Sequence, residues 1–534
     1  MRGFLLSAGL GVSFAIAASC GNSNHGTDIC ATTIPPPAAC MTACDPTPGA
    51  PNTCPSGYHC DADGKCDAQC TQGGSQCGDG FMCTSDGQCL GSGQCTGIAC
   101  QVAACDMQGQ SPTTITGTVF APNGTLPLYN VQVYIPNSDP GPFPDGVQCG
   151  RCDNGLPGDP IVQTTTDTNG NFTLSAIPSG SSIPVVITIG KWRRQITIPT
   201  VMDCTSTALA AADTTLPKSM SDMTPNTKSV DMPKVAISTG GADALECLVR
   251  KLGIADTEIG TAGGTQRVQL FADTMSGGEG ASSFQTGFPG GSGPFADSQS
   301  LWNTTAALSA YDITILSCEG GQFSNTKSQA ALTSLESYAE AGGRVFMSHW
   351  HNIWIEGATQ DGTGQVNADW KNIAKWNDNG ANTDGGANYK GNDTIDEGDN
   401  PDGNAFATWM LNVMGSTVRD QIVLQSGTGK STAVTVDETL GQQWAYTASG
   451  GSDAQMFQFL ASPPPNAPVG DASSACGKVV FSDMHVSGDS SSSTGVPYPG
   501  PGNGKGCSTA GLTPQEKALA FMFFDISACI GIIP

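Results

Sequence analysis

The sequence predicts a chain of three parts: a disulfide-rich N-terminal region, a β-sandwich, and an α/β domain built on a doubly wound parallel sheet. The cysteines predict the first part, because 14 of the 22 lie at or before Cys105. Short runs of alternating apolar and polar residues over 113–204 predict the second. From 233 to 534, strand-like apolar runs alternate with helix-like segments, which is typical of a mainly parallel sheet.

The first 19 residues predict export. Met1 and Arg2 precede an apolar run to Ala18, and small residues lead to Cys20. This is typical of a secretory signal peptide over 1–19, and the run is too short to span a membrane. The segment resembles a bacterial lipoprotein signal, which implies lipidation of Cys20 and a membrane anchor at the outer membrane or cell surface. Ala17 stands where that family usually has Leu, and plain secretion or a periplasmic location is the alternative.

The region 20–106 contains an internal repeat. Cys54–Cys66 and Cys77–Cys89 both read C-x-x-G-aromatic-x-C-x-x-D-G-x-C. The Asp-Gly pairs suit tight turns between cysteines, so we expect small disulfide-linked hairpins that serve as a stalk, a spacer or an adhesive module. A metal cluster is the rival interpretation, but no histidine-containing finger spacing occurs here.

The composition and net charge limit the classes of partner that the chain can bind. The chain has 22 basic and 47 acidic residues, a net charge of -25, so we expect no nucleic-acid partner. With 69 glycines and 34 prolines it is typical of a loop-rich extracellular protein.

The second part, 113–204, is predicted to hold about six short strands, with a turn at Asn169-Gly170. The runs 115–119, 131–134 and 166–180 resemble a carboxypeptidase regulatory-like, transthyretin-like domain, which implies scaffolding or surface binding and no catalytic residues. Cys149 and Cys152 form a C-x-x-C that suits a redox pair, half a zinc site or, as we prefer, a structural disulfide involving this pair or Cys204. The Ser/Thr/Asp-rich stretch 205–232 is predicted to be a linker.

The third part places reactive side chains at strand ends. Strands are predicted at 234–237, 267–272, 313–316, 344–347 and 478–481, and helices at 242–252, 327–341 and from Thr513. Functional groups of such sheets gather beyond the carboxyl ends of the strands. Six residues with suitable chemistry lie there and are the candidate catalytic set: Cys318, Glu319, His349, His351, Asp483 and His485.

The runs 311–320 and 342–349 resemble a class I glutamine amidotransferase-like domain, and more closely its trehalose-utilisation-type branch. The resemblance implies a flavodoxin-like fold. Where amidotransferases place a catalytic cysteine on a sharp turn, this chain has His349, and Cys318 lies one strand earlier. Glutaminase activity is therefore not inferred.

Three interpretations of these strand ends stay open. His349, His351 and His485 could ligate Zn²⁺, with Asp483 or Glu319 as a further ligand or base, in a metal-dependent hydrolase. Cys318 could instead be a nucleophile activated by a histidine. In the third interpretation the side chains only cap strand ends.

Binding is the other class of function that the sequence supports. Trp350 and Trp354 suit a sugar or peptide ligand. The Asn/Asp/Gly-rich stretch 377–404, inside an insertion-rich part 356–475, could hold Ca²⁺. We expect an exported, lipid-anchored cell-envelope protein that binds a glycan or peptide or acts as a scaffold, with the metal-dependent hydrolase as the alternative.

Overall fold

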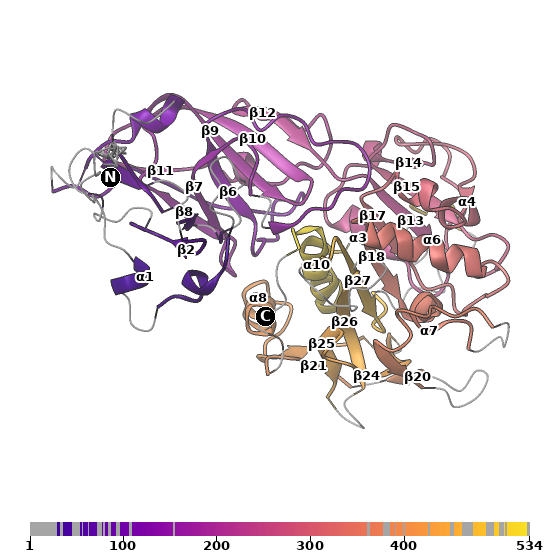
Figure 1. Cartoon of the computed structure of the whole chain (residues 1–534). Coiled ribbons are helices and arrows are strands. Elements are labelled where there is room, and N and C mark those ends of the chain that lie inside the picture. Colours follow the sequence, from indigo (N-terminus) through magenta and orange to yellow (C-terminus); the bar gives the residue numbers. More distant parts are fainter. Residues whose placement is uncertain are drawn as a thin grey trace, which may run out of the picture. The chain divides into compact units, whose positions relative to one another are not determined.

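The structure is a computed structural model of the chain (Figure 1). It describes residues 29–530 with gaps, of which the longest are 45–53, 378–384, 462–473 and 487–495. The predicted signal peptide and Cys20 lie outside the described residues. The chain divides into two compact units, residues 1–94 and 95–534, and each is described by itself. None of the described helices has the length and hydropathy that a bilayer crossing requires.

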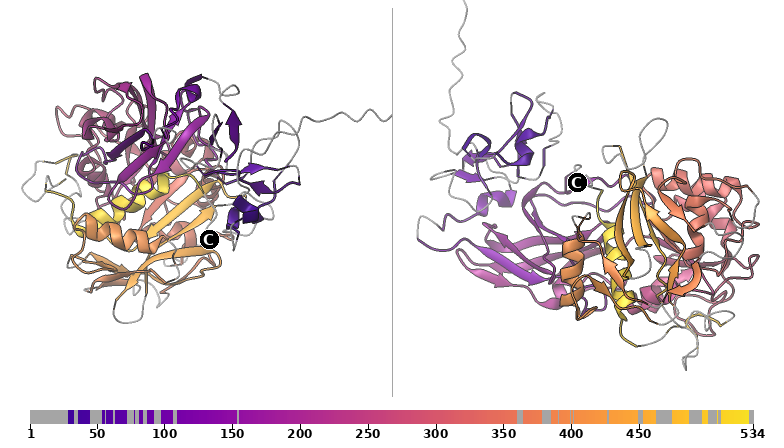
Figure 2. Two further views of the ribbon diagram at one scale, coloured as in Figure 1. Left: turned by 90° about the vertical axis from the view of Figure 1, so that its left-hand side faces the viewer. Right: turned by 90° about the horizontal axis from the view of Figure 1, so that it is seen from below.

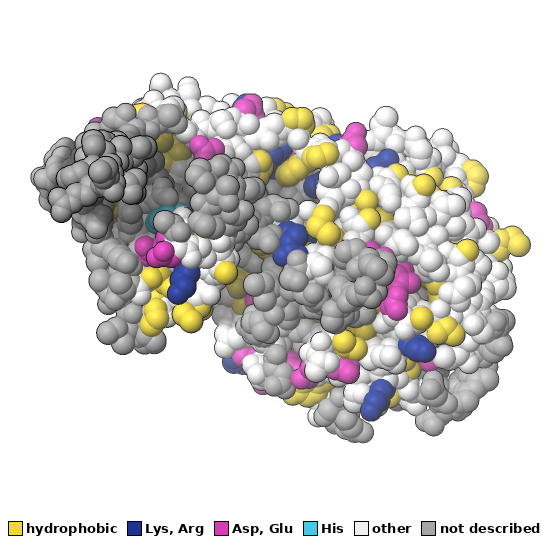
Figure 3. All heavy atoms as spheres, viewed as in Figure 1, with side chains coloured by type: hydrophobic (Ala, Val, Ile, Leu, Met, Phe, Trp, Pro, Cys, Tyr) yellow, Lys and Arg dark blue, Asp and Glu magenta, His cyan; other side chains and the backbone are white. Residues whose placement is uncertain are grey.

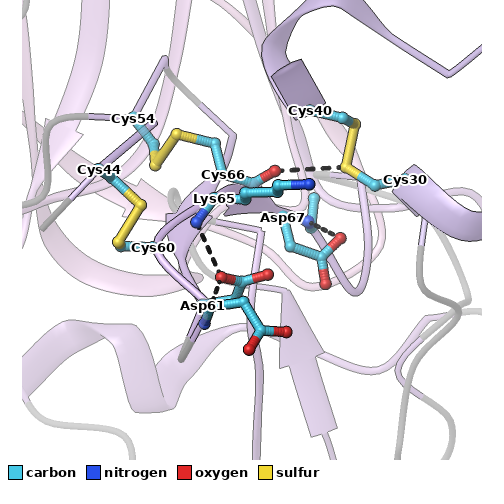
Figure 4. Close-up of a disulfide and its surroundings, with 11 residues drawn as sticks. Cys30, Cys40, Cys44, Cys54, Cys60, Asp61, Lys65, Cys66 and Asp67 are labelled. Atoms are coloured by element: carbon cyan, nitrogen blue, oxygen red, sulfur yellow. Dashed lines mark hydrogen bonds between the residues drawn. A yellow bond between two sulfur atoms is a disulfide. The ribbon is translucent and has the colours of Figure 1, made fainter. Parts of the chain in front are cut away.

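Small disulfide-linked hairpins build the first unit, as the repeat predicts. Strand β1 (His59–Cys60) pairs with β2 (Cys66–Asp67), and β3 (Phe81–Cys83) pairs with β4 (Cys89–Gly91). Short helices α1 (Ile29–Thr32) and η1 (Ala38–Met41) precede them. In the first copy, Asp61 closes the turn by accepting hydrogen bonds from the backbone N–H groups of Asp63 and Lys65, both at 2.9 Å (Figure 4).

Each repeat copy uses its cysteines in the same way. The first and last cysteines of a copy pair with each other, and the middle one pairs with a cysteine upstream; the bonds are Cys54–Cys66, Cys77–Cys89, Cys44–Cys60 and Cys70–Cys83. Two groups of these cysteines lie close enough to share a metal ion. Because their thiols are already oxidised in pairs, they act as staples.

The second unit begins with η2 (Gly97–Gln101) and two β-sheets that share a core. The five-stranded sheet has the order β12-β10-β9-β6-β7, and the three-stranded sheet has the order β11-β5-β8. The strands are β5 (Thr114–Thr118), β6 (Gln132–Pro136), β7 (Pro160–Thr165), β8 (Asn171–Ser175), β9 (Gly180–Ile189), β10 (Trp192–Val201), β11 (Ser206–Ala208) and β12 (Thr227–Asp231). Residues 205–232 are therefore not a free linker: they supply β11, β12 and the short helix α2 (Ala211–Thr214).

Buried arginines explain why this stretch joins the sheet. Arg193 and Arg194 on β10 are each only 1% exposed. Arg193 pairs with Asp231 on β12 at 2.8 Å, and Arg194 pairs with Asp222 at 2.7 Å. A buried guanidinium requires such partners, so the acidic residues that made the stretch look solvated are what hold it in place.

A mixed sheet of eleven strands forms the rest of the unit. Its parallel half runs β14-β15-β13-β17-β18-β27, with β16 beside β15. These strands are β13 (Val235–Thr239), β14 (Ile259–Thr261), β15 (Val268–Ala272), β16 (Ala296–Asp297), β17 (Ile313–Leu316), β18 (Arg344–Ser348) and β27 (Gly477–Ser482). The five predicted strands are confirmed, and all residues of β13, β15, β17, β18 and β27 are buried, as expected of a sheet covered on both faces.

Helices cover both faces of this sheet. Side chains of α3 (Leu245–Lys251) and α10 (Pro514–Ser527) belong to one hydrophobic cluster, and those of α6 (Gln329–Glu340) belong to another. Ser328 caps α6, and Thr513 and Glu516 form the predicted capping box of α10. Short helices η5 (Asp256–Glu258), α4 (Gln299–Trp302) and α5 (Thr305–Leu308) complete this part.

The antiparallel half of the sheet comes from the part predicted to be insertion-rich. Strands β26 (Ala454–Ala461), β25 (Gly441–Thr447), β21 (Asp393–Ile395) and β22 (Gln421–Ile422) extend the sheet beyond β27. Around them lie α8 (Gly403–Asn412) and two small pairs, β19 (Ala374–Trp376) with β24 (Ala433–Val436) and β20 (Gly385–Tyr389) with β23 (Gly429–Ser431). The sheet is mainly parallel, as predicted, with seven of its eleven strands in parallel pairing; the other four pair antiparallel, because β26 returns antiparallel to β27.

Helix α10 lies between this sheet and the β-sandwich (Figures 1 and 2). It packs Phe521 against Tyr129 and Phe523 and Phe524 against Trp192. Its residues are buried almost all round, as a helix covered on two sides requires. The described face in Figure 3 shows lysines and arginines scattered singly over this unit.

Four disulfides whose cysteines are both described staple the second unit. The C-x-x-C does not pair internally: Cys149 bonds to Cys476, and Cys152 bonds to Cys529. Cys105 bonds to Cys204, and Cys247 bonds to Cys507. The structural interpretation of the C-x-x-C is confirmed, but its partners are distant cysteines of the α/β part.

Candidate functional site

Three residues that the sequence singled out meet at the ends of three neighbouring strands. Cys318 follows β17, His349 follows β18 and His485 follows β27. The Nδ1 atom of His349 lies 3.5 Å from the Sγ atom of Cys318 and 3.2 Å from the Nε2 atom of His485. All three side chains are buried, and the three potential ligand atoms lie within 4.8 Å of one another.

The register of the parallel strands places these three residues at the same height along the sheet, just beyond the strand ends. Leu316 pairs with Met347, so Cys318 and His349 each lie two residues past a paired position. Ser348 pairs with Ser482, and His485 lies three residues past that pair. The juxtaposition therefore follows from the parallel alignment of β17, β18 and β27.

The backbone of Cys318 is fixed by a glycine turn. Its carbonyl oxygen accepts hydrogen bonds from the N–H groups of Ala242 at 3.0 Å and Asp243 at 3.2 Å. A Cβ atom at Gly240 would lie 2.2 Å from the same oxygen, so only glycine fits there. The Sγ atom of Cys318 accepts a hydrogen bond from the N–H of Gly320 at 3.4 Å.

The backbone of His485 is held on both sides. Its N–H donates to the carbonyl oxygen of Thr428 at 2.9 Å, and its own carbonyl oxygen accepts from the side-chain amide of Gln515 at 3.1 Å. Gln515 lies in the first turn of α10, so the helix start positions this ligand atom.

His349 occupies a sharp turn between strand and helix. Its φ is 44°, in the left-handed region that non-glycine residues rarely adopt. It opens η6 (His349–Asn352), which continues into α7 (Ile353–Glu356). Strain of this kind persists where the surroundings fix a side chain in a required direction.

The three groups are uncharged in the absence of a ligand. Burial lowers the pKa of His349 well below its usual value and that of His485 to about 3. Burial also raises the pKa of the Cys318 thiol to about 12. A thiolate–imidazolium pair, which nucleophilic cysteines use, is thus disfavoured here.

Asp243 supports two of the three ligand-bearing turns. Its carboxylate accepts hydrogen bonds from the hydroxyl of Ser348 at 2.7 Å and the N–H of Val486 at 2.9 Å. These residues adjoin His349 and His485. Burial raises the pKa of Asp243 to about 7.

The structure separates His351 from this cluster. Its Nε2 lies 2.9 Å from the carbonyl oxygen of Ser317, and its Nδ1 accepts from the Nε1–H of Trp354 at 2.9 Å. Both ring nitrogens are engaged, so this histidine has no lone pair left for a metal ion. The expectation that His351 completes a three-histidine metal site does not fit this geometry.

The two tryptophans proposed for ligand binding differ. Trp354 is fully buried and holds His351, so its face serves packing. Trp350 is half-buried, and its ring centroid lies 4.9 Å from that of His349. Trp350 is thus the one of the pair that stays next to the site.

Glu319 points away from the cluster into an ion network. Its carboxylate lies 2.7 Å from the ammonium of Lys327, which also lies 3.4 Å from Asp273. All three side chains are at most 1% exposed. Burial raises the pKa of Glu319 to about 7.

Asp483 anchors the antiparallel half of the sheet. It accepts hydrogen bonds from the N–H groups of Thr432 at 2.7 Å and Ala433 at 2.9 Å, and from the Thr432 hydroxyl. It therefore fixes the segment that runs beside His485.

Two residues near the cluster were not predicted from the sequence. Asp243 follows the Gly240-Gly241 turn after β13, a position at a strand end that could have been flagged. Lys430 on β23 lies close enough for its charge to lower the pKa of both His349 and His485. No local pattern marks Lys430, because β23 reaches the site only through the tertiary fold.

A separate acidic cavity of about 410 Å³ lies beside β21. It is lined by Thr394, Ile395, Asp396, Glu397, Gly398, Asp420, Glu438, Gln443 and Tyr446. None of the predicted catalytic or zinc-binding residues lines it, but 394–398 belong to the stretch predicted to hold Ca²⁺. Within the predicted Ca²⁺ stretch, 378–384 lie outside the described residues, and for 385–389 only the backbone is described.

Comparisons with known proteins leave the chain without an assigned family. No family model matches it, and no curated protein matches it significantly. Two solved chains from type II cohesin–X-dockerin complexes of Acetivibrio cellulolyticus, an N-terminal and a C-terminal interface mutant, are each 16% identical. Each covers 25% of this chain, and 79% and 78% of the solved chains are covered, with a TM-score of 0.15. A score this low supports no structural argument.

Proposed function

We propose that Cys318, His349 and His485 bind one zinc ion and that the α/β domain is a zinc-dependent hydrolase. The observation that carries this proposal is the convergence of one thiol and two imidazole nitrogens from three adjacent strand ends. Cysteine sulfur and histidine nitrogen are the ligands that zinc prefers. Three protein ligands leave the fourth tetrahedral position for a water molecule, as in catalytic rather than structural zinc sites.

Two of the three distances between the ligand atoms agree with a tetrahedron, and the third, from Cys318 to His485, is within 4.8 Å. Bond lengths of about 2.3 Å for Zn–S and about 2.05 Å for Zn–N place S and N about 3.6 Å apart and two N atoms about 3.3 Å apart. The corresponding separations are 3.5 Å from Cys318 to His349 and 3.2 Å from His349 to His485.

Hydrogen bonds alone explain the arrangement less well. The Nδ1 atom of a neutral imidazole offers either one proton or one lone pair. In His349 this atom has two neighbours, Sγ of Cys318 and Nε2 of His485. A shared metal ion satisfies all three atoms together.

The redox state of Cys318 supports the same proposal. It is the free cysteine among the described residues, while at least nine pairs of the others are disulfide-bonded. A metal would hold its sulfur as a thiolate despite the high pKa that burial imposes on the free thiol, because metal binding displaces the proton.

Metal analysis tests the proposal. The full-length chain, purified without chelators, should contain one zinc per molecule, and Cys318→Ser and His485→Gln should each lose it. His351→Gln is the matched control, since it alters a buried histidine outside the cluster, and it should keep its zinc. Circular dichroism of each variant separates loss of metal from loss of fold. A folded wild type without stoichiometric metal would refute the zinc site.

A hydrolase assay tests the activity. Wild-type protein should hydrolyse members of an ester, amide and phosphoester panel, with activity lost on chelation and restored by zinc. A zinc-loaded protein that is inactive across the panel would leave a metal site without the proposed activity.

We also propose that the protein is exported, that its α/β domain has a flavodoxin-like core, and that its β-sandwich is transthyretin-like. The leader-like 1–19 and the disulfides support export, with a lipid anchor at Cys20 as the membrane attachment. The strand order β15-β13-β17-β18-β27 supports a flavodoxin-like core, since it follows the order 2-1-3-4-5. The sheets of β5 to β12 support a transthyretin-like sandwich that presents the domain to a glycan or peptide.

A further inference from the structure

An amine and two carboxyl groups meet in the interior of the α/β domain. The Nζ atom of Lys327 lies 2.7 Å from Oε2 of Glu319 and 3.4 Å from Oδ2 of Asp273. All three side chains are at most 1% exposed. An amine and a carboxyl group are the two groups from which an amide bond forms, and fixing them side by side speeds such a reaction greatly.

Aromatic rings and a hydrogen bond hold the amine in this place. Nζ lies 5.2 Å from the ring centroid of the fully buried Trp302 and 5.8 Å from that of Phe323. The indole N–H of Trp302 donates to the carbonyl oxygen of Thr326 at 3.1 Å, which ties the ring to the residue before Lys327. The amine is therefore enclosed by rings and carboxyl groups, away from the bulk water that would favour hydrolysis of an amide.

The charges of the three groups favour a shared proton. Together they are neutral only when the two carboxyl groups hold one proton between them, and a surplus buried charge is costly. One oxygen of each carboxyl, Oδ1 of Asp273 and Oε1 of Glu319, has no hydrogen-bond partner among the described residues. Burial raises the pKa of Glu319 to about 7, so this carboxyl can both accept and release a proton near neutral pH.

We propose that Lys327 and Asp273 form an amide bond spontaneously in the folded protein, with Glu319 transferring the protons. The hydroxyl of Thr326 donates to Oδ2 of Asp273 at 2.5 Å, the oxygen on which negative charge develops when the amine attacks. The bond does not depend on the proposed zinc site.

The reaction releases one water molecule and needs no oxidant or reductant. Glu319 takes one proton from the ammonium of Lys327, and the free amine attacks Cγ of the protonated Asp273. Glu319 then gives its proton to Oδ1 and takes a second one from the nitrogen. The N–Cγ bond forms, the Cγ–Oδ1 bond breaks, and Oδ1 leaves as water. The product is a neutral amide beside a protonated Glu319, so the charges of all three groups are removed.

The bond joins two elements at the same edge of the sheet. Asp273 directly follows β15, and Lys327 lies just before Ser328, the cap of α6. Disulfides persist only in an oxidising environment, whereas an amide also withstands reductants. The bond therefore adds a permanent link to a chain that is otherwise stapled by disulfides.

Peptide mass spectrometry of the full-length protein, reduced and denatured before digestion, tests the proposal. Trypsin should not cleave after Lys327, because the amide removes the positive charge that trypsin recognises. The digest should instead contain 268–344 as one peptide, lighter by one water molecule than its sequence. Lys251, a buried lysine that pairs with Glu516 at 2.6 Å, is the control in the same digest and should be cleaved.

A second digestion, after aromatic residues, locates the bond. It should leave two peptides joined through Asp273 and Lys327, and Lys327→Gln should abolish the joined product. A peptide joined through Glu319 would overturn the assignment of Asp273. Cleavage after Lys327 in folded wild-type protein, with all peptides at the masses of their sequences, would overturn the bond itself.

Glu319→Gln tests the proton transfer, because glutamine keeps the shape of the side chain but cannot take the proton. Bond formation, followed in samples taken over time after synthesis, should be about 100-fold slower or more. Glu340→Gln, at a half-buried carboxyl near the end of α6, is the matched control and should react as the wild type does. Circular dichroism verifies that both variants fold. Equal rates in the two folded variants would overturn the role of Glu319.

Discussion

Cys318 and Glu319 are adjacent in the chain after β17, yet their side chains lie in different surroundings, here called the Cys318 side and the Glu319 side. On the Glu319 side, two carboxylates share the ammonium of Lys327, so opposite charges meet within the protein. On the Cys318 side, a thiol and two imidazoles share one point without any countercharge. The first side balances its charges within the protein, although one carboxylate oxygen each of Glu319 and Asp273 has no hydrogen-bond partner among the described residues. The second side gathers three metal-ligand atoms and balances none of them with a charge. Ligand atoms that converge in a buried place without a balancing charge, as on the Cys318 side, point to a bound ion.

The same contrast separates His349 from His351. Both are buried, and only one residue lies between them. His351 uses both ring nitrogens within the fold, whereas His349 leaves Nε2 without a described partner. Four substitutions or additions test whether buried groups with partners contribute to stability, and whether the Cys318, His349 and His485 cluster contributes to metal binding.

Removing the charge that completes the ion network should have the largest effect. Lys327→Met leaves two buried carboxylates without a countercharge and should lower the free energy of unfolding by about 3–5 kcal/mol. Chemical denaturation measures it. Lys228→Met breaks the exposed pair with Asp139 and should leave the free energy of unfolding nearly unchanged. Equal losses would mean that the buried network has no special role.

Zinc binding at Cys318, His349 and His485 should stabilise the folded protein. At a free zinc concentration of 100 times the dissociation constant, the free energy of unfolding should rise by about 2.7 kcal/mol. Denaturation with and without zinc measures it. Cys318→Ser should abolish the increase. An increase that survives this change would place the zinc elsewhere.

His351→Phe should cost stability without affecting the metal. It leaves the indole N–H of Trp354 and the carbonyl oxygen of Ser317 buried without partners, a loss of about 2 kcal/mol. Zinc content and thermal unfolding are measured together. Loss of zinc in a folded His351→Phe protein would show that the two histidines act together.

Glu246 should produce the smallest effect per pH unit, seen as a pH dependence of the free energy of unfolding. It is fully buried on α3, and burial raises the pKa of its carboxyl to about 8. The folded state therefore keeps a proton that the unfolded state loses near pH 4.5. Stability should fall as pH rises from about 4.5 to 8, by at most about 1.4 kcal/mol per unit from this group. Glu246→Gln should flatten that slope in unfolding measurements at pH 5 to 8.5, and an unchanged slope would contradict the assignment.

The sequence predicted the strand ends well because their signals are local. Apolar runs and the capping box at Thr513 located β17, β18, β27 and α10 within one or two residues. The parallel alignment of these strands then brought Cys318, His349 and His485 together. His351 was misleading for the same reason, since a two-residue spacing cannot show that the chain turns into η6 directly after Ser348.

The remaining features depend on tertiary contacts. The antiparallel half of the sheet comes from strands separated by loops of differing length, and no period in the sequence reveals that β26 returns beside β27. Residues 205–232 looked like a linker because their acidic residues suit solvent as well as buried arginines. Asp243 reaches the cluster from the turn between β13 and α3, and Lys430 reaches it from β23, both far from it in sequence.

The pairing of Cys149 and Cys152 with Cys476 and Cys529 has a topological consequence. The segment from 476 to 529, which carries His485, is joined at both ends to the same short turn and so forms a closed covalent ring. A protease that cut the chain once between 153 and 475 would separate the sequence of His485 from that of the turn without releasing either piece. The fragments would migrate as one molecule on a gel until a reductant opened the ring.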